Sequence, residues 1–160
     1  METAIYTTIN SISRDEWEAC RSSKAGGDPF LSYDFFFLLE TSNSVGPKTG
    51  WIPFYIIFKE KNIVVGIIIS FLKNHSQGEY VFDHSWADAY ERSGGNYYPK
   101  LQVAVPFTPV SGERILVQSE YEDKVGEMIS SAKRLVEENN LSSLHITFCS
   151  KSFVLSLIHI

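Results

Sequence analysis

Residues 51–72 read WIPFYIIFKEKNIVVGIIISFL. This segment holds two runs of β-branched and aromatic residues, 51–58 and 63–72, joined by the polar residues 59–62. Such residues favour strands, and the short polar connection predicts a hairpin. Both runs are apolar at successive positions, which predicts the centre of a sheet that helices cover on both faces. Gly66 interrupts the second run and predicts a bulge or a close backbone approach.

The residues before this hairpin predict one strand and two helices. Residues 4–9 alternate as in a short strand, and Ser13 with Glu16 has the spacing of a capping box. A short helix is expected to begin there and to bury Trp17 and Cys20. Residues 24–29 read as a loop, and a second helix is expected after a cap at Ser32, ending within residues 41–46.

Residues 73–114 have a different texture, because they are rich in aromatic, Gly, Pro and ionisable residues without a sustained period. We interpret them as an insertion in which function is to be sought. Asp83 is expected to cap a short helix that carries Trp86, Ala89 and Tyr90. Residues 101–105 predict a strand that leads into a proline-fixed loop at 106–112.

The last part of the chain predicts a strand, a long helix and a strand. Residues 115–118 form the first strand, and Ser119 with Glu122 forms a second capping box for the helix. Its apolar stripe comprises Tyr121, Val125, Met128, Ile129, Ala132, Leu135 and Val136. Asn139 ends it, and residues 144–149 predict a final buried strand. We expect one domain over residues 1–150, with residues 151–160 the tail of an incomplete chain.

Composition restricts the function classes. Hydrophobic residues make up 44% of the 160 residues and aromatic residues 14%, which predicts a folded chain. The net charge of −5, without a basic cluster, argues against a nucleic-acid duplex or an anionic membrane surface as partner. The longest apolar stretch is too short to span a bilayer, and no signal peptide is recognisable. Cys20 and Cys149 match no metal or redox spacing and predict two free buried thiols, typical of a cytoplasmic protein, with a disulfide as the less favoured alternative.

Several motifs together resemble a known family. They are GEYVFD at 78–83, WADAY at 86–90, YYPKL at 97–101 and VPFTPVSGER at 105–114, with PFLS at 29–32 and SVGPKTGW at 44–51 upstream. This set is similar to the signature of bacterial predicted N-acyltransferases, which are related to GNAT domains and to Fem-type peptidyltransferases. The resemblance covers the chain up to about residue 117.

The resemblance implies an α/β GNAT-like (acyl-CoA N-acyltransferase) fold, with a mixed central sheet flanked by helices and an aromatic-rich insertion. It also implies transfer of an acyl or aminoacyl group to an amine acceptor, such as a peptidoglycan precursor. Acyl-CoA or aminoacyl-tRNA would be the donor, and a second GNAT-like domain, missing from this sequence, would be a partner. The alternative is a non-catalytic binding module for a cell-wall precursor or a protein.

One position departs from acyl-CoA-dependent GNAT enzymes, in which a glycine-rich loop before the long helix presents amides to a pyrophosphate. Here residues 118–123 read QSEYED, with no glycine and three carboxylates, which would repel a pyrophosphate. We therefore expect the missing half to bind the donor, this half to bind the acceptor, and the present chain to be inactive alone.

Acyl transfer to an amine needs a base and an oxyanion-stabilising group. Glu79 and Asp83 are the candidate catalytic bases, because aromatic surroundings raise the pKa of a carboxyl group. His75 and His84 are candidates by their intrinsic pKa. The alternative is that these groups cap the short helix and satisfy buried tyrosines.

The candidate substrate-binding residues all lie in the insertion. Lys73, Lys100 and Arg114 would contact a phosphate or carboxylate, although Arg114 could instead anchor its loop and a lone lysine is often plain surface. The aromatic residues would stack on a sugar or a base, or else form core. The complete set is Lys73, Tyr80, Trp86, Asp88, Tyr97, Tyr98, Lys100, Thr108 and Arg114. Glu79, Asp83, His84 and Asp88 match no metal-site spacing, so no metal is expected.

Overall fold

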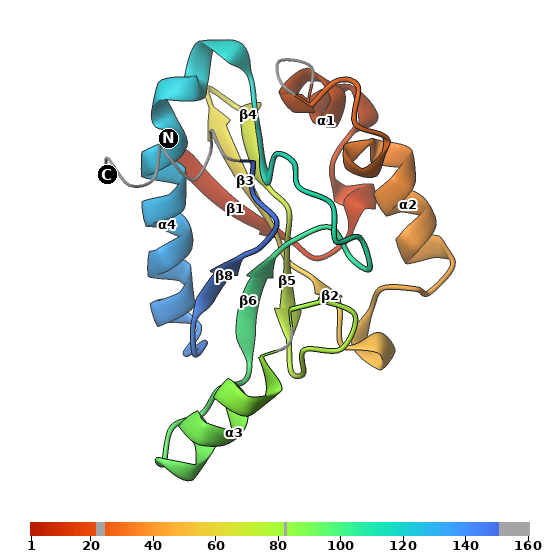
Figure 1. The fold of residues 1–160 in the computed structure, drawn as a ribbon. Coiled ribbons are helices and arrows are strands. Elements are labelled where there is room, and N and C mark those ends of the chain that lie inside the picture. The colour runs from red at the N-terminus through yellow and green to blue at the C-terminus, as the bar shows by residue number, and fades with distance from the viewer. Residues whose placement is uncertain (22–24, 82, 151–160) are drawn as a thin grey trace.

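The strands form two four-stranded sheets in a computed structural model that describes residues 1–21, 25–81 and 83–150 (Figure 1). The first sheet has the order β1 (Glu2–Tyr6), β3 (Tyr55–Glu60), β4 (Ile63–Ile68), β7 (Ile115–Val117). The second has the order β2 (Ile52–Pro53), β5 (Ser70–Lys73), β6 (Lys100–Val103), β8 (Leu144–Ile146). Strands β6 and β8 run parallel, whereas the other paired strands are antiparallel.

The predicted α/β class is confirmed, but the prediction of one central sheet is wrong. The chain passes from one sheet to the other at Phe54, between β2 and β3, and again at Ile69, between β4 and β5. Both residues are apolar and buried, like their neighbours. The change of sheet therefore leaves no mark on the hydrophobic pattern.

The predicted hairpin is strands β3 and β4. Its turn residues Lys61 and Asn62 both have positive φ, as a tight two-residue turn requires. Of the two predictions for Gly66 the bulge is confirmed, while the close neighbour is a side chain and not a backbone segment. The strand register shifts directly after the pair of Phe58 and Gly66, and a Cβ on Gly66 would lie 2.5 Å from the Cε of Met128.

Helices cover the hairpin from both sides, as predicted. Helices α1 (Arg14–Arg21) and α2 (Tyr33–Thr41) lie on one side and α4 (Val125–Glu138) on the other (Figure 1). Trp17 and Phe36 belong to the first core, and Met128 belongs to the second. The central strands thus supply both cores.

The predicted helix starts have mixed outcomes. Ser13 accepts a hydrogen bond from the Glu16 amide at 3.2 Å, while the Glu16 carboxylate accepts one from the Ser13 amide at 3.0 Å, so the first capping box is confirmed. The cap at Ser32 is confirmed as well. The second box is wrong. A 3₁₀-helix, η4 (Ser119–Lys124), occupies the position of the expected box, so α4 begins only at Val125. Three shorter 3₁₀-helices occur at 9–11, 29–31 and 47–49.

The end of the described chain is less buried than predicted. Strand β8 lies at the edge of the second sheet and is half-buried throughout, so it is not the fully buried strand that the sequence indicated. The expected tail, residues 151–160, lies outside the described residues.

The two thiols differ in burial. Both cysteines are free, as predicted, but Cys20 is buried whereas Cys149 is half-buried. Burial raises the pKa of Cys20 to about 12, so this thiol stays protonated. Among the described helices none combines the length and the apolar composition needed to cross a membrane.

Candidate functional site

Two lysines face each other where β5 and β6 meet. Lys73 and Lys100 are direct partners in the antiparallel register, and opposite residues of such a pair project to the same face of the sheet. Both side chains are 0% exposed. Two buried ammonium groups on one face are costly unless carboxylates neutralise them, so this face needs acidic partners.

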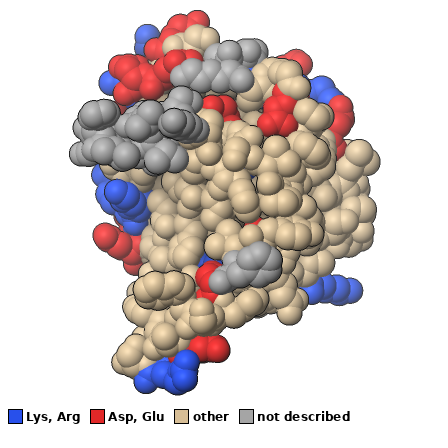
Figure 2. Space-filling view, in the orientation of Figure 1, with Lys and Arg blue, Asp and Glu red and all other residues tan. Residues whose placement is uncertain are grey.

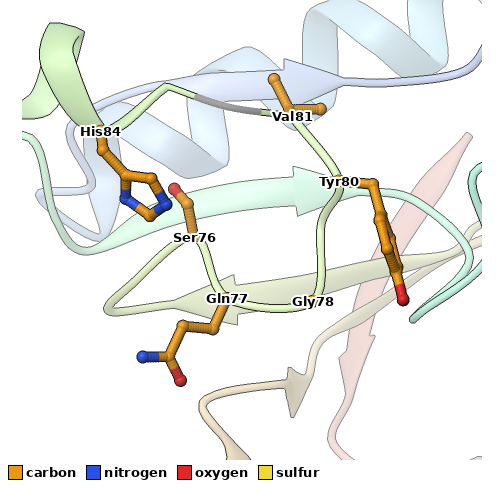
Figure 3. A pocket seen from close by; sticks show the side chains of 6 residues that line it. All are labelled: Ser76, Gln77, Gly78, Tyr80, Val81 and His84. Carbon is orange, nitrogen blue, oxygen red and sulfur yellow. The ribbon is translucent and has the colours of Figure 1, made fainter.

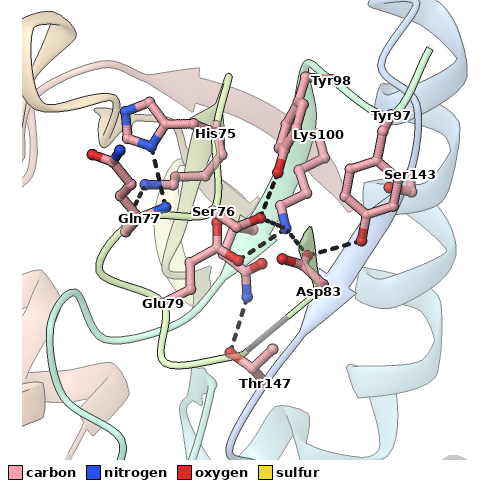
Figure 4. A network of polar contacts seen from close by, with 12 residues as sticks. His75, Ser76, Gln77, Glu79, Asp83, Tyr97, Tyr98, Lys100, Ser143 and Thr147 are labelled. Atoms are coloured by element: carbon pink, nitrogen blue, oxygen red, sulfur yellow. Dashed lines mark hydrogen bonds and ion pairs between the residues drawn. The ribbon is translucent and has the colours of Figure 1, made fainter. Parts of the chain in front are cut away.

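The segment that joins β5 to α3 supplies these partners. We call the described residues 74–81 and 83 the pocket loop. The Nζ atom of Lys100 donates to Ser76 Oγ at 3.0 Å, to Glu79 Oε2 at 2.9 Å and to Asp83 Oδ2 at 2.9 Å (Figure 4). All three ammonium donors are thus used, and the loop is fastened to β6 through one cation.

Asp83 lies at the N-cap position of helix α3 (His84–Arg92), but its side chain makes no capping bond to the described residues. Its carboxylate instead accepts hydrogen bonds from Lys100 and, at 2.8 Å, from the Tyr97 hydroxyl. The predicted helix is therefore confirmed and the predicted cap is wrong, because an ammonium ion is a stronger partner than an amide. Burial alone would raise the pKa of Asp83, but the bonds from Lys100, Ser76 and Tyr97 outweigh it and hold the pKa below its usual value.

Glu79 is held less favourably. Burial raises the pKa of this carboxyl group above its usual value, although the Lys100 ammonium opposes the shift. Its Oε1 atom has no hydrogen-bond partner, and neither has Asp83 Oδ1. Within residues 1–21, 25–81 and 83–150, the other buried side-chain N and O atoms without a partner are Trp51 Nε1 and Gln102 Oε1.

These unpaired atoms gather in one region. Trp51 lies under Lys73, whose Nζ atom is 3.7 Å from the ring centroid, and Gln102 follows Lys100 by two positions on β6. Folded proteins leave few buried polar atoms unpaired, and those that remain tend to mark functional sites. The region around the two lysines is therefore the best candidate site.

Lys73 has weaker compensation than Lys100. It donates to the Gln77 carbonyl at 3.1 Å and lies on the face of Trp51. Burial, together with the Lys100 ammonium, lowers the pKa of Lys73 to about 8, although Glu79 opposes the shift. The pocket loop is thus held by two cations, one through its backbone and one through its side chains.

The loop encloses a pocket of about 250 Å³, lined by Ser76, Gln77, Gly78, Tyr80, Val81 and His84 (Figure 3). Gly78 has φ +77°, and a Cβ there would lie 2.7 Å from the Phe107 ring, so the loop needs glycine at this position. Ser76 links the pocket to the cluster of side chains around Lys100, which comprises Glu79, Asp83, Tyr97, Tyr98 and Lys100 and which we call the buried cluster. Its Oγ atom accepts from Lys100 and lies 2.7 Å from the Tyr98 hydroxyl.

A family model described as peptidoglycan biosynthesis/recognition, FemAB-like, matches residues 8–157. The chain belongs to the FemAB-like family. The resemblance to Fem-type proteins is thereby confirmed. Comparison of the chain with the curated proteins and with the solved structures gives no match.

The structure brings together many of the residues that the sequence nominated in this FemAB-like chain. Five of them meet in the buried cluster, namely Glu79, Asp83, Tyr97, Tyr98 and Lys100. Lys73 lies beside this cluster, and Tyr80 lines the pocket. Trp86 and Asp88 instead lie exposed on α3, which projects from the body (Figure 1). Thr108 belongs to the proline-fixed loop and bonds to the Pro106 carbonyl. Their roles in catalysis or binding stay predictions.

Arg114 has an arrangement that favours loop anchoring. It is 2% exposed and donates to the carbonyls of Val110 at 2.6 Å, Thr147 at 2.8 Å and Glu113 at 2.9 Å. These bonds tie the proline-fixed loop to the segment after β8. Contact between Arg114 and a ligand stays a prediction.

Sequence reasoning missed some members of the site. Ser76 and Gln77 were not nominated, nor were Trp51 and Gln102. One signal was available, because β6 reads KLQV and its polar residues alternate, so that one face of this strand must meet polar groups. Of the two candidate histidines, His84 lines the pocket, whereas the half-buried His75 accepts a hydrogen bond from the Gln77 amide. No group of three or more His, Cys, Asp or Glu side chains in the described ranges is placed to hold a metal.

Proposed function

We propose that this chain forms the acceptor-binding part of an N-acyltransferase or aminoacyltransferase that acts on the amine of a peptidoglycan precursor. The family supports a role in peptidoglycan biosynthesis or recognition. The observation that carries the finer proposal is the pocket, in which a hydroxyl polarised by a buried cation and an exposed imidazole line one small cavity.

Ser76 is the proposed hydrogen-bond donor. Its oxygen accepts from the Lys100 ammonium and can accept a second bond from the Tyr98 hydroxyl, so that its own proton, which also interacts with the Asp83 carboxylate, can turn to a ligand. Donation from a cation makes a hydroxyl a stronger donor in turn. Such a donor suits a carbonyl oxygen that gains negative charge during acyl transfer.

His84 is the proposed proton acceptor. It is exposed and lines the pocket, so it can reach the proton of an attacking amine. Glu79 and Asp83, the bases that the sequence nominated, are buried and already bonded to Lys100. In this proposal the two carboxylates position Lys100, and through it Ser76.

The size of the pocket limits what it accepts. About 250 Å³ is below the roughly 300–1,000 Å³ of sites for drug-sized ligands, so it would take one terminal group of the acceptor. The segment before α4 gives no support for a donor site, because η4 carries the carboxylates of Glu120, Glu122 and Asp123, which would repel a pyrophosphate. The donor would bind to another part of the full-length protein.

Turnover by variants of the full-length protein tests this proposal. The assay would combine amine-bearing peptidoglycan precursors with acyl-CoA or aminoacyl-tRNA donors. His84→Gln should lower kcat/KM by about 100-fold or more, the usual contribution of a general base. Ser76→Ala should lower kcat/KM about as strongly, because it removes the proposed oxyanion donor.

Ser85→Ala is the matched control, because Ser85 is exposed and does not line the pocket. Its kcat/KM should equal that of the wild type. Precursor binding without transfer from any donor would contradict the transferase proposal and support a recognition module. Unchanged turnover in both pocket variants would place the chemistry elsewhere.

A further inference from the structure

Tyr80 has a conformation that folding alone does not favour. Its φ is +57°, in the left-handed region where a bulky side chain costs on the order of 1–3 kcal/mol. Its side chain is 53% exposed. A strained residue needs a compensating contact, yet in the described part of the chain Tyr80 makes no hydrogen bond and no ring contact.

The other non-glycine residues with positive φ differ from Tyr80. Asn43 and Asn140 lie two residues after the ends of α2 and α4, and Lys61 and Asn62 form the hairpin turn. The ring of Phe107 packs on that of Trp51, with the ring centroids 5.6 Å apart, and Phe148 is half-buried. Asparagine is also the residue that tolerates this region best after glycine. Tyr80 therefore stands out as an exposed aromatic ring kept at a position where glycine would be more stable.

The surroundings of this ring indicate its use. Tyr80 lies on one side of the pocket lining, with Ser76 and His84 on the other (Figure 3). An exposed aromatic face beside hydroxyl, amide and imidazole groups suits a sugar ring, whose C–H face packs on the aromatic ring while its hydroxyl and acetamido groups form hydrogen bonds.

The charge around the pocket points to a neutral ligand. Lys73 and Lys100 are both 0% exposed, and Lys100 uses all three of its donors within the protein, so neither ammonium group is presented to a phosphate at the surface. Exposed Lys and Arg side chains lie mostly around the margin of the face that carries the pocket loop (Figure 2). A nucleotide diphosphate would need cations near the pocket mouth.

We infer that Tyr80 is a stacking residue that binds a neutral N-acetylated amino-sugar ring at the mouth of the pocket. This inference rests on the proposed function, because the sugar would belong to the peptidoglycan acceptor. Tyr80 thereby fixes the acceptor next to Ser76 and His84, and the strain in its backbone is the cost of presenting the ring.

Ligand-observed NMR with N-acetylglucosamine as the probe tests the inference. The wild type and Tyr80→Phe should bind the sugar with similar affinity, since both keep the ring. Tyr80→Gly should weaken binding at least tenfold. The same variant should unfold at an equal or higher urea concentration, because glycine relieves the strain at φ +57°.

Phe30→Ala is the control for loss of an exposed aromatic side chain, because Phe30 is 36% exposed and does not line the pocket. It should bind the sugar as the wild type does. Three results would overturn the inference: no N-acetylglucosamine binding by the wild type, unchanged binding by Tyr80→Gly, or equal loss in Phe30→Ala. Binding of uridine but not of the sugar would also overturn it, in favour of a nucleobase.

The failure of this inference is distinguishable from failure of the proposed function. Sugar binding that depends on Tyr80, in a full-length protein that transfers no acyl group, would keep the inference and contradict the transferase proposal. Transfer that Tyr80→Gly leaves unchanged in kcat and KM would do the reverse.

Discussion

Lys100 is the single cation on which the buried cluster depends. Lys100→Met should lower the free energy of unfolding by about 3–5 kcal/mol, because it leaves two buried carboxylates without their counter-charge. Urea denaturation followed by circular dichroism measures the change. The exposed Lys133→Met is the control and should stay within about 0.5 kcal/mol of the wild type. Adding Glu79→Gln and Asp83→Asn to the Lys100 variant should recover part of the loss, and a Lys100 variant as stable as the wild type would contradict the assignment.

Lys73 should make stability depend on alkaline pH. Its pKa is lowered to about 8 in the folded protein, from 10.5, so between these values the unfolded chain binds more protons and stability rises with pH. Lys73→Met keeps the apolar contact with Trp51 and removes the titration. The wild type should therefore gain about 3 kcal/mol relative to this variant between pH 8 and pH 10.5. Urea denaturation of both proteins across this range measures the gain, and parallel pH profiles would contradict the prediction.

The pocket loop depends, as an element, on close approach at Gly78. Gly78→Ala should destabilise the protein by about 1–3 kcal/mol, because it adds a steric contact with Phe107 to an unfavourable φ. Gly94→Ala is the matched control, since Gly94 also has positive φ but a Cβ there meets no atom within 4 Å. Thermal unfolding compares them. Equal losses in both variants would mean that φ alone, and not packing on Phe107, requires the glycine.

Ser13 and Ser119 both have the spacing of a capping box, but their replacement by alanine should have different effects on stability. Ser13→Ala should cost about 1 kcal/mol, because Ser13 caps α1. Ser119→Ala should cost less than about 0.5 kcal/mol, since this segment is a 3₁₀-helix whose N-cap is Gln118. Urea denaturation separates the two values, and equal costs would show that Ser119 caps a helix in solution.

These two serines show what sequence can and cannot predict about the elements. Local signals located α1, α2 and the hairpin, because a cap or a turn depends on residues close in sequence. The start of α4 was misplaced because the Gln118 side chain bonds to the carbonyl of Val64, which lies far away in sequence. The division into two sheets is equally non-local.

The candidate site follows the same rule. Glu79 and Asp83 were nominated because aromatic surroundings raise the pKa of a carboxyl group, and Lys100 because a lysine can contact a phosphate or carboxylate. Their mutual bonding could not be predicted, because the register that places Lys73 opposite Lys100 is set by strand pairing across a long insertion. Pocket residues such as Ser76 are common surface types, and only the fold gives them a partner such as Lys100.

At the scale of the whole molecule, the central hairpin joins the two cores. Ile57 on β3 packs in the core under α1 and α2, and its neighbour Ile56 packs in the core under α4. Neither core can lose its central strands without the other, so we expect one cooperative unfolding transition. Trp17 and Trp51 both lie in the first core and report on it by fluorescence.

Ile56→Ala should test this coupling, because it removes apolar volume only from the second core. It should lower the free energy of unfolding by about 2–5 kcal/mol and shift the tryptophan fluorescence transition together with the circular dichroism transition. Ile57→Ala, the matched variant on the opposite face, should shift both signals in the same way. If Ile56→Ala moved the circular dichroism transition but left the fluorescence of Trp17 and Trp51 unchanged, the two cores would unfold independently. The pocket loop would then depend on a core that opens without the rest of the molecule, because Leu101 and Val103 of β6, the strand that carries Lys100, belong to the second core.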